Sequence, residues 1–86
     1  MTIAELKKLV GNKKLVLGAD RTIKELKKGE VKKIFLSSNC SKAVKEEIEF
    51  NAKLVSVEVS QLEASNDELG VIVKKPFAVS VISLLK

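Results

Sequence analysis

The residues best suited to chemistry lie where an apolar stretch ends at a glycine and a basic segment begins. After the apolar residues 15–17, this corner holds Gly18, Ala19, Asp20, Arg21 and Lys24. The pattern predicts a strand that turns directly into a helix, with Asp20 as the N-cap residue. A helix start exposes backbone N–H groups and the positive end of the helix dipole, which together bind anions and phosphate above all. With Arg21 and Lys24 beside it, the corner is predicted to contact a nucleic acid backbone.

The side chains on which most enzymes depend are missing. The chain has no histidine and one cysteine, Cys40, which excludes a zinc site of the usual kind and a cysteine–histidine nucleophile. It also lacks the glycine patterns of dinucleotide and phosphate loops. Glu46, Glu47 and Glu49 could act as paired carboxylates, but an acidic run beside lysines is more typical of a solvated helix face. We therefore expect no enzymatic activity, no cofactor and no metal.

Length and composition indicate one small globular domain, residues 1–86. The chain is 45% hydrophobic and 31% charged, and no apolar run approaches the roughly 18 residues of a membrane span. Its first ten residues include Lys7 and Lys8 and have no long uncharged core, unlike a secretory signal. These features predict a cytoplasmic protein.

Charge is divided unevenly along the chain. Residues 1–45 hold twelve basic and four acidic side chains, a net of +8, whereas residues 46–86 hold four basic and seven acidic ones, a net of −3. This segregation favours a polyanionic partner for the first half. A solvated surface rich in lysine and glutamate, as in heat-adapted proteins, explains the charge equally well, so charge alone leaves both interpretations open.

Hydrophobic periodicity and capping signals divide the chain into eight elements. Helices are predicted over residues 2–10, 20–28, 42–51 and 66–72, and strands over 14–17, 33–37, 55–59 and 77–85. A capping box begins at Thr2, Ser41 is a predicted N-cap, and Ser65 opens a second capping box. The alternation of helix and strand predicts an α/β fold, a three-layer α/β/α sandwich whose four-stranded mixed sheet has helices on both faces.

The loops that follow the first two strands are expected at one edge of this sheet, because the carboxyl ends of parallel strands gather there. One loop is the Gly18 corner, the other is the polar turn Ser38–Cys40, and both lead into helix starts. The segment 73–77 reaches the same edge if the last strand runs antiparallel to the first two. The sequence leaves that direction open.

Several segments of the sequence resemble one known family. They are Gly18–Lys24 with Leu26 and Gly29, residues 37–39 with 45–54, Asn66–Gly70, and Lys75–Val79. The glycine corner resembles the kink-turn RNA-binding superfamily of ribosomal and ribonucleoprotein proteins. The later segments are similar to one branch of it, large-subunit ribosomal protein thirty of the archaeal and eukaryotic type.

The resemblance implies a single α/β/α domain that binds a kink-turn-like internal loop of ribosomal RNA through three loops. The residues that it assigns to RNA binding are Gly18, Ala19, Asp20, Arg21, Lys24, Asn39, Lys75 and Phe77. Gly18 would admit close backbone approach, Asn39 would bind a base edge, and Phe77 would stack on an extruded base. Without the resemblance, Asn39 is a turn residue and Phe77 a core residue. Neighbouring large-subunit ribosomal proteins are further implied partners, and neither a membrane nor a small-molecule substrate is implied.

Asp20 departs from the family, which usually places Asn, Lys or Arg at this position. An ionised carboxylate repels phosphate and can only accept hydrogen bonds, for example from guanine N1–H or N2–H. The departure predicts that neighbouring RNA or protein contacts complete the binding. Two other hypotheses remain open. One is a free-standing kink-turn-binding protein of a small ribonucleoprotein or an mRNA regulator, and the other is a protein-interaction module that uses the acidic second half.

Overall fold

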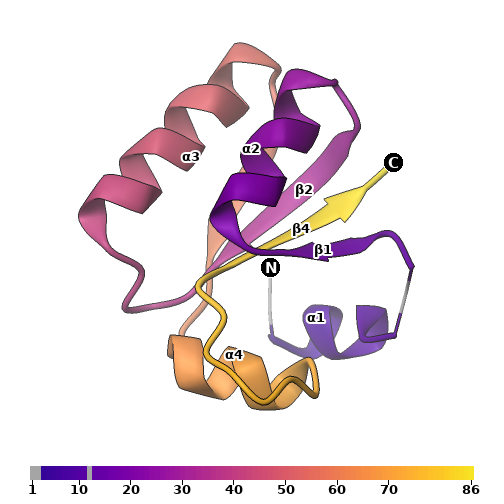
Figure 1. The fold of residues 1–86 in the computed structure, drawn as a ribbon, viewed down its shortest axis with the longest axis vertical. Coiled ribbons are helices and arrows are strands. Elements are labelled where there is room, and N and C mark those ends of the chain that lie inside the picture. The colour runs from indigo at the N-terminus through magenta and orange to yellow at the C-terminus, as the bar shows by residue number, and fades with distance from the viewer. Residues whose placement is uncertain (1–2, 12) are drawn as a thin grey trace.

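Four helices alternate with four strands in the computed structural model, which describes residues 3–11 and 13–86 (Figure 1). In chain order the elements are α1 (Ile3–Leu9), β1 (Leu15–Leu17), α2 (Ala19–Lys27), β2 (Val31–Leu36), α3 (Lys42–Leu54), β3 (Glu58–Gln61), α4 (Asn66–Ile72) and β4 (Val81–Leu85). This order confirms the predicted alternation. Thr2, the predicted first residue of a capping box, lies outside the described residues.

The strands form one mixed sheet in the order β1-β4-β2-β3. β2 and β3 are parallel, and β4 lies between β1 and β2 and runs antiparallel to both. β1 and β2 therefore point the same way, and their carboxyl ends lie at the edge where β4 begins. This direction of β4 brings the segment before it to the edge where the first two loops lie.

Helices cover both faces of the sheet, which confirms the predicted three-layer sandwich. α2 and α3 pack on one face, and α1 and α4 pack on the other (Figure 1). β2 contributes to both cores, because Ile34 and Leu36 pack with Ile48 of α3. Phe35 points the other way and packs with Leu69 of α4. β2 is thus the central, doubly covered strand that its apolar sequence predicts.

The helix caps predicted at Ser41 and Ser65 are both confirmed. The hydroxyl of Ser41 accepts the N–H of Val44 at 3.3 Å. Ser65 and Glu68 form a capping box, in which the Ser65 hydroxyl accepts the Glu68 N–H and the Glu68 carboxylate accepts the Ser65 N–H. These caps fix where α3 and α4 begin, and α4 begins beside the edge of the sheet where β4 starts.

The predicted strand over 55–59 is wrong in its first half. α3 continues to Leu54, and β3 starts only at Glu58. The N–H of Val57 donates to the carbonyl of Ala52 at 2.9 Å, and Ser56 has a φ of 57°. The chain therefore completes a helix-terminating turn before it reaches the sheet, and the alternating valines span both the turn and the strand.

The predicted strand over 77–85 also begins too early, because β4 starts at Val81. Beside the residues that precede Val81, β1 has already turned into α2 and β2 has given way to the loop before α3. The pairing between strands therefore stops there. Residues 77–80 run along the edge of the sheet and carry Phe77 at the surface, where its exposed fraction is 57%.

Candidate nucleic-acid interface

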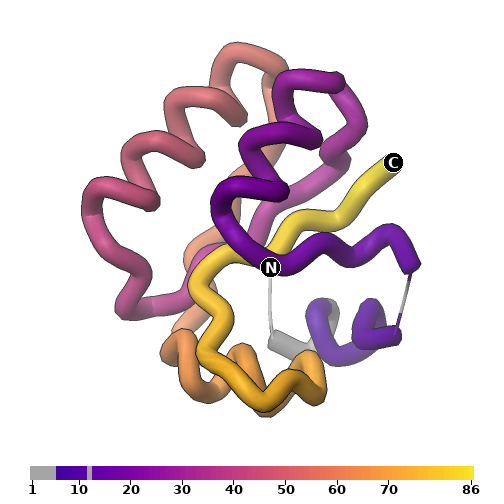
Figure 2. The backbone as a smooth tube through the Cα atoms, in the orientation of Figure 1, coloured from indigo at the N-terminus to yellow at the C-terminus, as the bar shows by residue number. Residues whose placement is uncertain are grey.

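The loops that leave β1 and β2 and the segment that enters β4 meet at one edge of the sheet. The N–H of Gly18 donates to the carbonyl of Val81 at 2.8 Å, and the N–H of Ser37 donates to that of Ser80 at 2.9 Å. In Figure 2 the yellow chain entering β4 passes between the start of α2 and the loop that precedes α3. The fold thus brings the three predicted loops together.

The start of α2 is capped by backbone alone. Gly18 holds the N-cap position, and among the described residues no side chain caps this start. The prediction of Asp20 as the N-cap is wrong, because the helix begins at Ala19 and places Asp20 in its first turn, exposed to solvent. The N–H groups of this turn are consequently left open to an external acceptor, and the helix dipole favours an anion there.

Gly18 is required at this start by its backbone conformation. Its φ of 104° and ψ of 149° lie in a region that essentially only glycine adopts. A Cβ built on Gly18 would meet no atom of the protein within 4 Å. A side chain would therefore strain the backbone and project into the open space in front of the helix start.

A cavity of about 410 Å³ opens at this edge. Five of the predicted RNA-binding residues line it, namely Gly18, Ala19, Arg21, Lys75 and Phe77. Leu15, Leu17 and Val44 add apolar surface. The cavity combines an apolar lining, an exposed aromatic ring and two cationic side chains, a combination that suits an unstacked base with its phosphates.

The remaining predicted residues lie outside the lining of this cavity. Asp20 and Lys24 are exposed on α2, on either side of Arg21 in the sequence. Asn39 is exposed on the loop between β2 and α3. Its Nδ2 donates to Oδ1 of Asn66 at 3.0 Å, and its Oδ1 accepts the backbone N–H of Asn66 at 2.9 Å.

Gly70 of α4 allows the Phe77 segment to approach closely. A Cβ built on Gly70 would collide with the carbonyl oxygen of Phe77 and would lie 3.1 Å from its carbonyl carbon. The carbonyl of Gly70 also accepts the N–H of Lys75 at 2.9 Å. In the sequence, Gly70 stands out only within the family pattern Asn66–Gly70, because no local signal marks its close approach to Phe77.

One family model matches nearly the whole chain. The model of the "Ribosomal protein L7Ae/L30e/S12e/Gadd45 family" matches residues 2–86. The chain belongs to this family. It is 37% identical over 82 residues to the large ribosomal subunit protein eL30 of Sulfurisphaera tokodaii, covering 95% of this chain and 77% of the relative. It is 40% identical over 72 residues to the eL30 of Methanococcus vannielii, covering 84% of this chain and 69% of the relative.

Solved structures share the fold of this chain at low sequence identity. A Bacillus halodurans protein of unknown function superposes with a TM-score of 0.84 at 20% identity, covering 94% of this chain and 80% of that one. The 15.5kD RNA-binding protein of Giardia lamblia gives 0.81 at 14% identity, covering 94% and 68%. The predicted family and branch are confirmed by the sequence relatives. These relatives are ribosomal proteins and not enzymes, which agrees with the prediction that this family member is not an enzyme.

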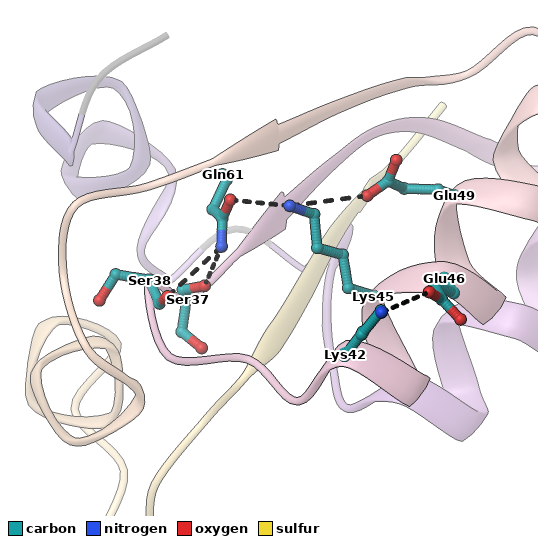
Figure 3. A network of polar contacts seen from close by, with 7 residues as sticks. All are labelled: Ser37, Ser38, Lys42, Lys45, Glu46, Glu49 and Gln61. Atoms are coloured by element: carbon teal, nitrogen blue, oxygen red, sulfur yellow. Dashed lines mark hydrogen bonds and ion pairs between the residues drawn. The ribbon is translucent and has the colours of Figure 1, made fainter.

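A polar network in this family member fixes the loop that carries Asn39 (Figure 3). Nε2 of Gln61 donates to the carbonyls of Ser37 and Ser38 at 3.3 and 3.4 Å. Oε1 of Gln61 accepts from Nζ of Lys45 at 3.1 Å, and Lys45 also pairs with Glu49 at 3.9 Å. The network joins the end of β3 to the loop and to α3, so Asn39 projects from a supported backbone.

The α3 surface carries ordinary solvated charges. Lys42 pairs with Glu46 at 3.9 Å in an i, i+4 arrangement, as Lys45 does with Glu49. Such exposed pairs contribute about 0.3–0.5 kcal/mol each. The acidic run of this helix thus has the geometry of a solvated face.

Cys40 follows Asn39 at the same edge and is partly buried. Burial raises the pKa of the Cys40 thiol, and the positive charge of Lys45 opposes that shift. Within residues 3–11 and 13–86, no group of three His, Cys, Asp or Glu side chains is placed to hold a metal ion. In the same part of the chain, no helix has the length and apolar character needed to cross a membrane.

Proposed function

We propose that this chain is a structural protein of the large ribosomal subunit that binds a kink-turn-like internal loop of ribosomal RNA. The observation that carries the proposal is the cavity at the sheet edge, where a helix start, Arg21, Lys75 and the exposed ring of Phe77 surround one apolar space. The eL30 relatives support the ribosomal assignment. The protein acts as a single RNA-binding domain over residues 1–86, in the cytoplasm, beside other large-subunit proteins.

Each part of the edge has a role in this proposal. Arg21, Lys24 and Lys75 neutralise phosphates, with the N–H groups of the first α2 turn as additional donors. The open space at Gly18 and the small side chain of Ala19 admit the RNA backbone. Phe77 stacks on a base that leaves the internal loop, as RNA-binding proteins commonly read unstacked bases.

Asp20 limits how tightly the isolated chain holds RNA. Its carboxylate does not cap α2, so it stands exposed beside the proposed phosphate contacts. It can accept from N1–H or N2–H of a guanine, but it cannot donate to O6. Further contacts from the assembled subunit then complete the binding.

The salt dependence of RNA binding tests this proposal. A helix–internal-loop–helix RNA is expected to bind more tightly than a continuous duplex of equal length. Because each neutralised phosphate contributes roughly −0.7 to −0.9 to the slope of log K against log salt, the three cations predict a slope of about −2 to −3. Fluorescence anisotropy across a salt series measures both quantities.

Lys75→Gln is expected to reduce the magnitude of that slope by about 0.7–0.9. Lys53→Gln is the matched control, because Lys53 is also an exposed lysine but lies near the far end of α3. Equal affinity for the loop and the duplex, or an affinity that salt does not change, would contradict the proposal.

A further inference from the structure

We propose that Asn66 is a positioning residue, which holds Asn39 in place for RNA binding and links its loop to the segment that carries Phe77. This inference rests on the proposed function, because it concerns residues assigned there to RNA. It adds a residue of α4 to the site, although α4 does not line the cavity.

The contact between the two asparagines is defined by a backbone donor. The N–H of Asn66 donates to the side chain of Asn39 at 2.9 Å, so the atom that faces it must be the oxygen of that amide. The nitrogen of the same amide then donates to Oδ1 of Asn66 at 3.0 Å. Both polar atoms of the Asn39 side chain are thus held by one residue, which fixes the orientation of the amide.

Asn66 also holds the other loop. Its carbonyl accepts the N–H of Val79 at 3.0 Å, within the segment that enters β4. Just before Asn66, the carbonyl of Ala64 accepts the N–H of Ser38 at 2.8 Å. The beginning of α4 is therefore bonded on one side to the Asn39 loop and on the other to the Phe77 segment.

The helix itself does not need the Asn66 side chain. The capping box of Ser65 and Glu68 already satisfies the start of α4. Asparagine is also a weak helix former, so helix propensity does not account for its presence at this first position. The hydrogen bonds between the two asparagines are exposed to solvent, so core packing does not account for them either.

The contact with Asn66 limits the hydrogen bonds that the Asn39 amide can form with RNA. A side-chain amide has two N–H donors and two oxygen lone pairs. Asn66 uses one of each, which leaves one donor and one acceptor. Asn39 is then expected to form single hydrogen bonds to a base or sugar, instead of a paired contact along a base edge.

A double-mutant cycle on RNA affinity tests this role. The probe is the helix–internal-loop–helix RNA, and the variants are Asn39→Ala, Asn66→Ala and the double variant. Each single change is expected to weaken binding by roughly 2- to 13-fold, the range of one ordinary hydrogen bond. If Asn66 acts through Asn39, the double variant binds no more weakly than Asn39→Ala. Losses that multiply in the double variant overturn the inference.

Asn66→Asp provides a rescue, because it keeps the oxygen that accepts from Asn39 and the backbone N–H. Asn66→Asp should restore binding in the chain that keeps Asn39, but not in combination with Asn39→Ala. The combined variant also measures the effect of the added charge on RNA affinity. In the free protein, Asn66→Ala should shift the Nδ2 proton resonances of Asn39, whereas unshifted resonances overturn the contact.

The failure of the inference and that of the proposed function are distinguishable. If the unmodified chain does not bind the RNA, the proposed function fails. If Asn39→Ala binds as tightly as the unmodified chain, the role of Asn39 fails, and that of Asn66 fails with it. If the unmodified chain binds the RNA and Asn39→Ala weakens binding, but the two single losses multiply in the double variant, Asn39 keeps its role. The positioning role of Asn66 is then overturned.

Discussion

Phe77→Ala is expected to weaken binding of a helix–internal-loop–helix RNA by roughly 5- to 150-fold, which corresponds to about 1–3 kcal/mol of lost stacking. Phe77 is 57% exposed and lines the cavity, so the loss of its ring removes a platform for a base and little of the core. The free energy of unfolding should therefore change little. Anisotropy titration and urea denaturation of the same samples separate the two effects.

Phe50→Ala is the matched control for this experiment. Phe50 is an aromatic residue of similar exposure, 66%, but it lies on α3 and outside the cavity lining. Its replacement should leave RNA affinity unchanged. Equal losses in the two variants would show a general effect of exposed aromatic rings, and an unchanged affinity in Phe77→Ala would remove Phe77 from the interface.

Gly70→Ala is expected to lower both stability and RNA affinity. The added methyl group would collide with the backbone carbonyl of Phe77, which cannot move aside as a flexible side chain can. Overpacking of this kind costs about 1–3 kcal/mol, and the better helix propensity of alanine offsets at most about 1 kcal/mol of it. Because the Phe77 segment must shift, RNA affinity should fall together with the free energy of unfolding.

Val71→Ala is the control for Gly70→Ala, since Val71 lies next to Gly70 on α4 and the residue is 76% exposed. Alanine favours helix formation here and adds no atom that valine lacks, so stability should stay equal or rise slightly. If Gly70→Ala is as stable as Val71→Ala, the close approach of the Phe77 segment to α4 is wrong.

Much of the fold is encoded in local patterns that can be read directly. Ser41 and Ser65 mark helix starts through hydroxyl caps that need only nearby residues. The apolar centre of β2 predicts burial on both faces, because Ile34 and Phe35 alternate between the two cores. These signals act within a few residues, and the order of the elements follows from them.

The errors fall where long-range pairing determines the local structure. Valines at 55, 57 and 59 alternate like a strand, but the first two lie in the turn after α3 and only Val59 belongs to β3. The apolar run before Val81 loses its strand partners as the sheet ends. Asp20 is a good cap by type, but the conformation of Gly18 starts α2 too early for it.

The candidate site also contains residues that the sequence identifies and residues whose roles only the folded chain shows. Gly18, Arg21 and their helix start belong to one continuous segment, so the sequence alone indicates an anion-binding corner. Asn66 and Gly70 act on residues that only the folded chain brings near, 27 positions away in the case of Asn39. Their roles depend on hydrogen-bond partners and on the space available for a Cβ. The hydrophobic pattern of the sequence indicates neither of these.

An amide chemical-shift titration of the labelled chain with the helix–internal-loop–helix RNA tests the RNA-binding edge most directly. The largest changes are expected at residues 18–21, 37–39 and 75–80, and residues 50–57 at the far end of α3 should remain unchanged. Changes centred on residues 50–57, or no change along the three loops at saturating RNA, would contradict the proposed interface.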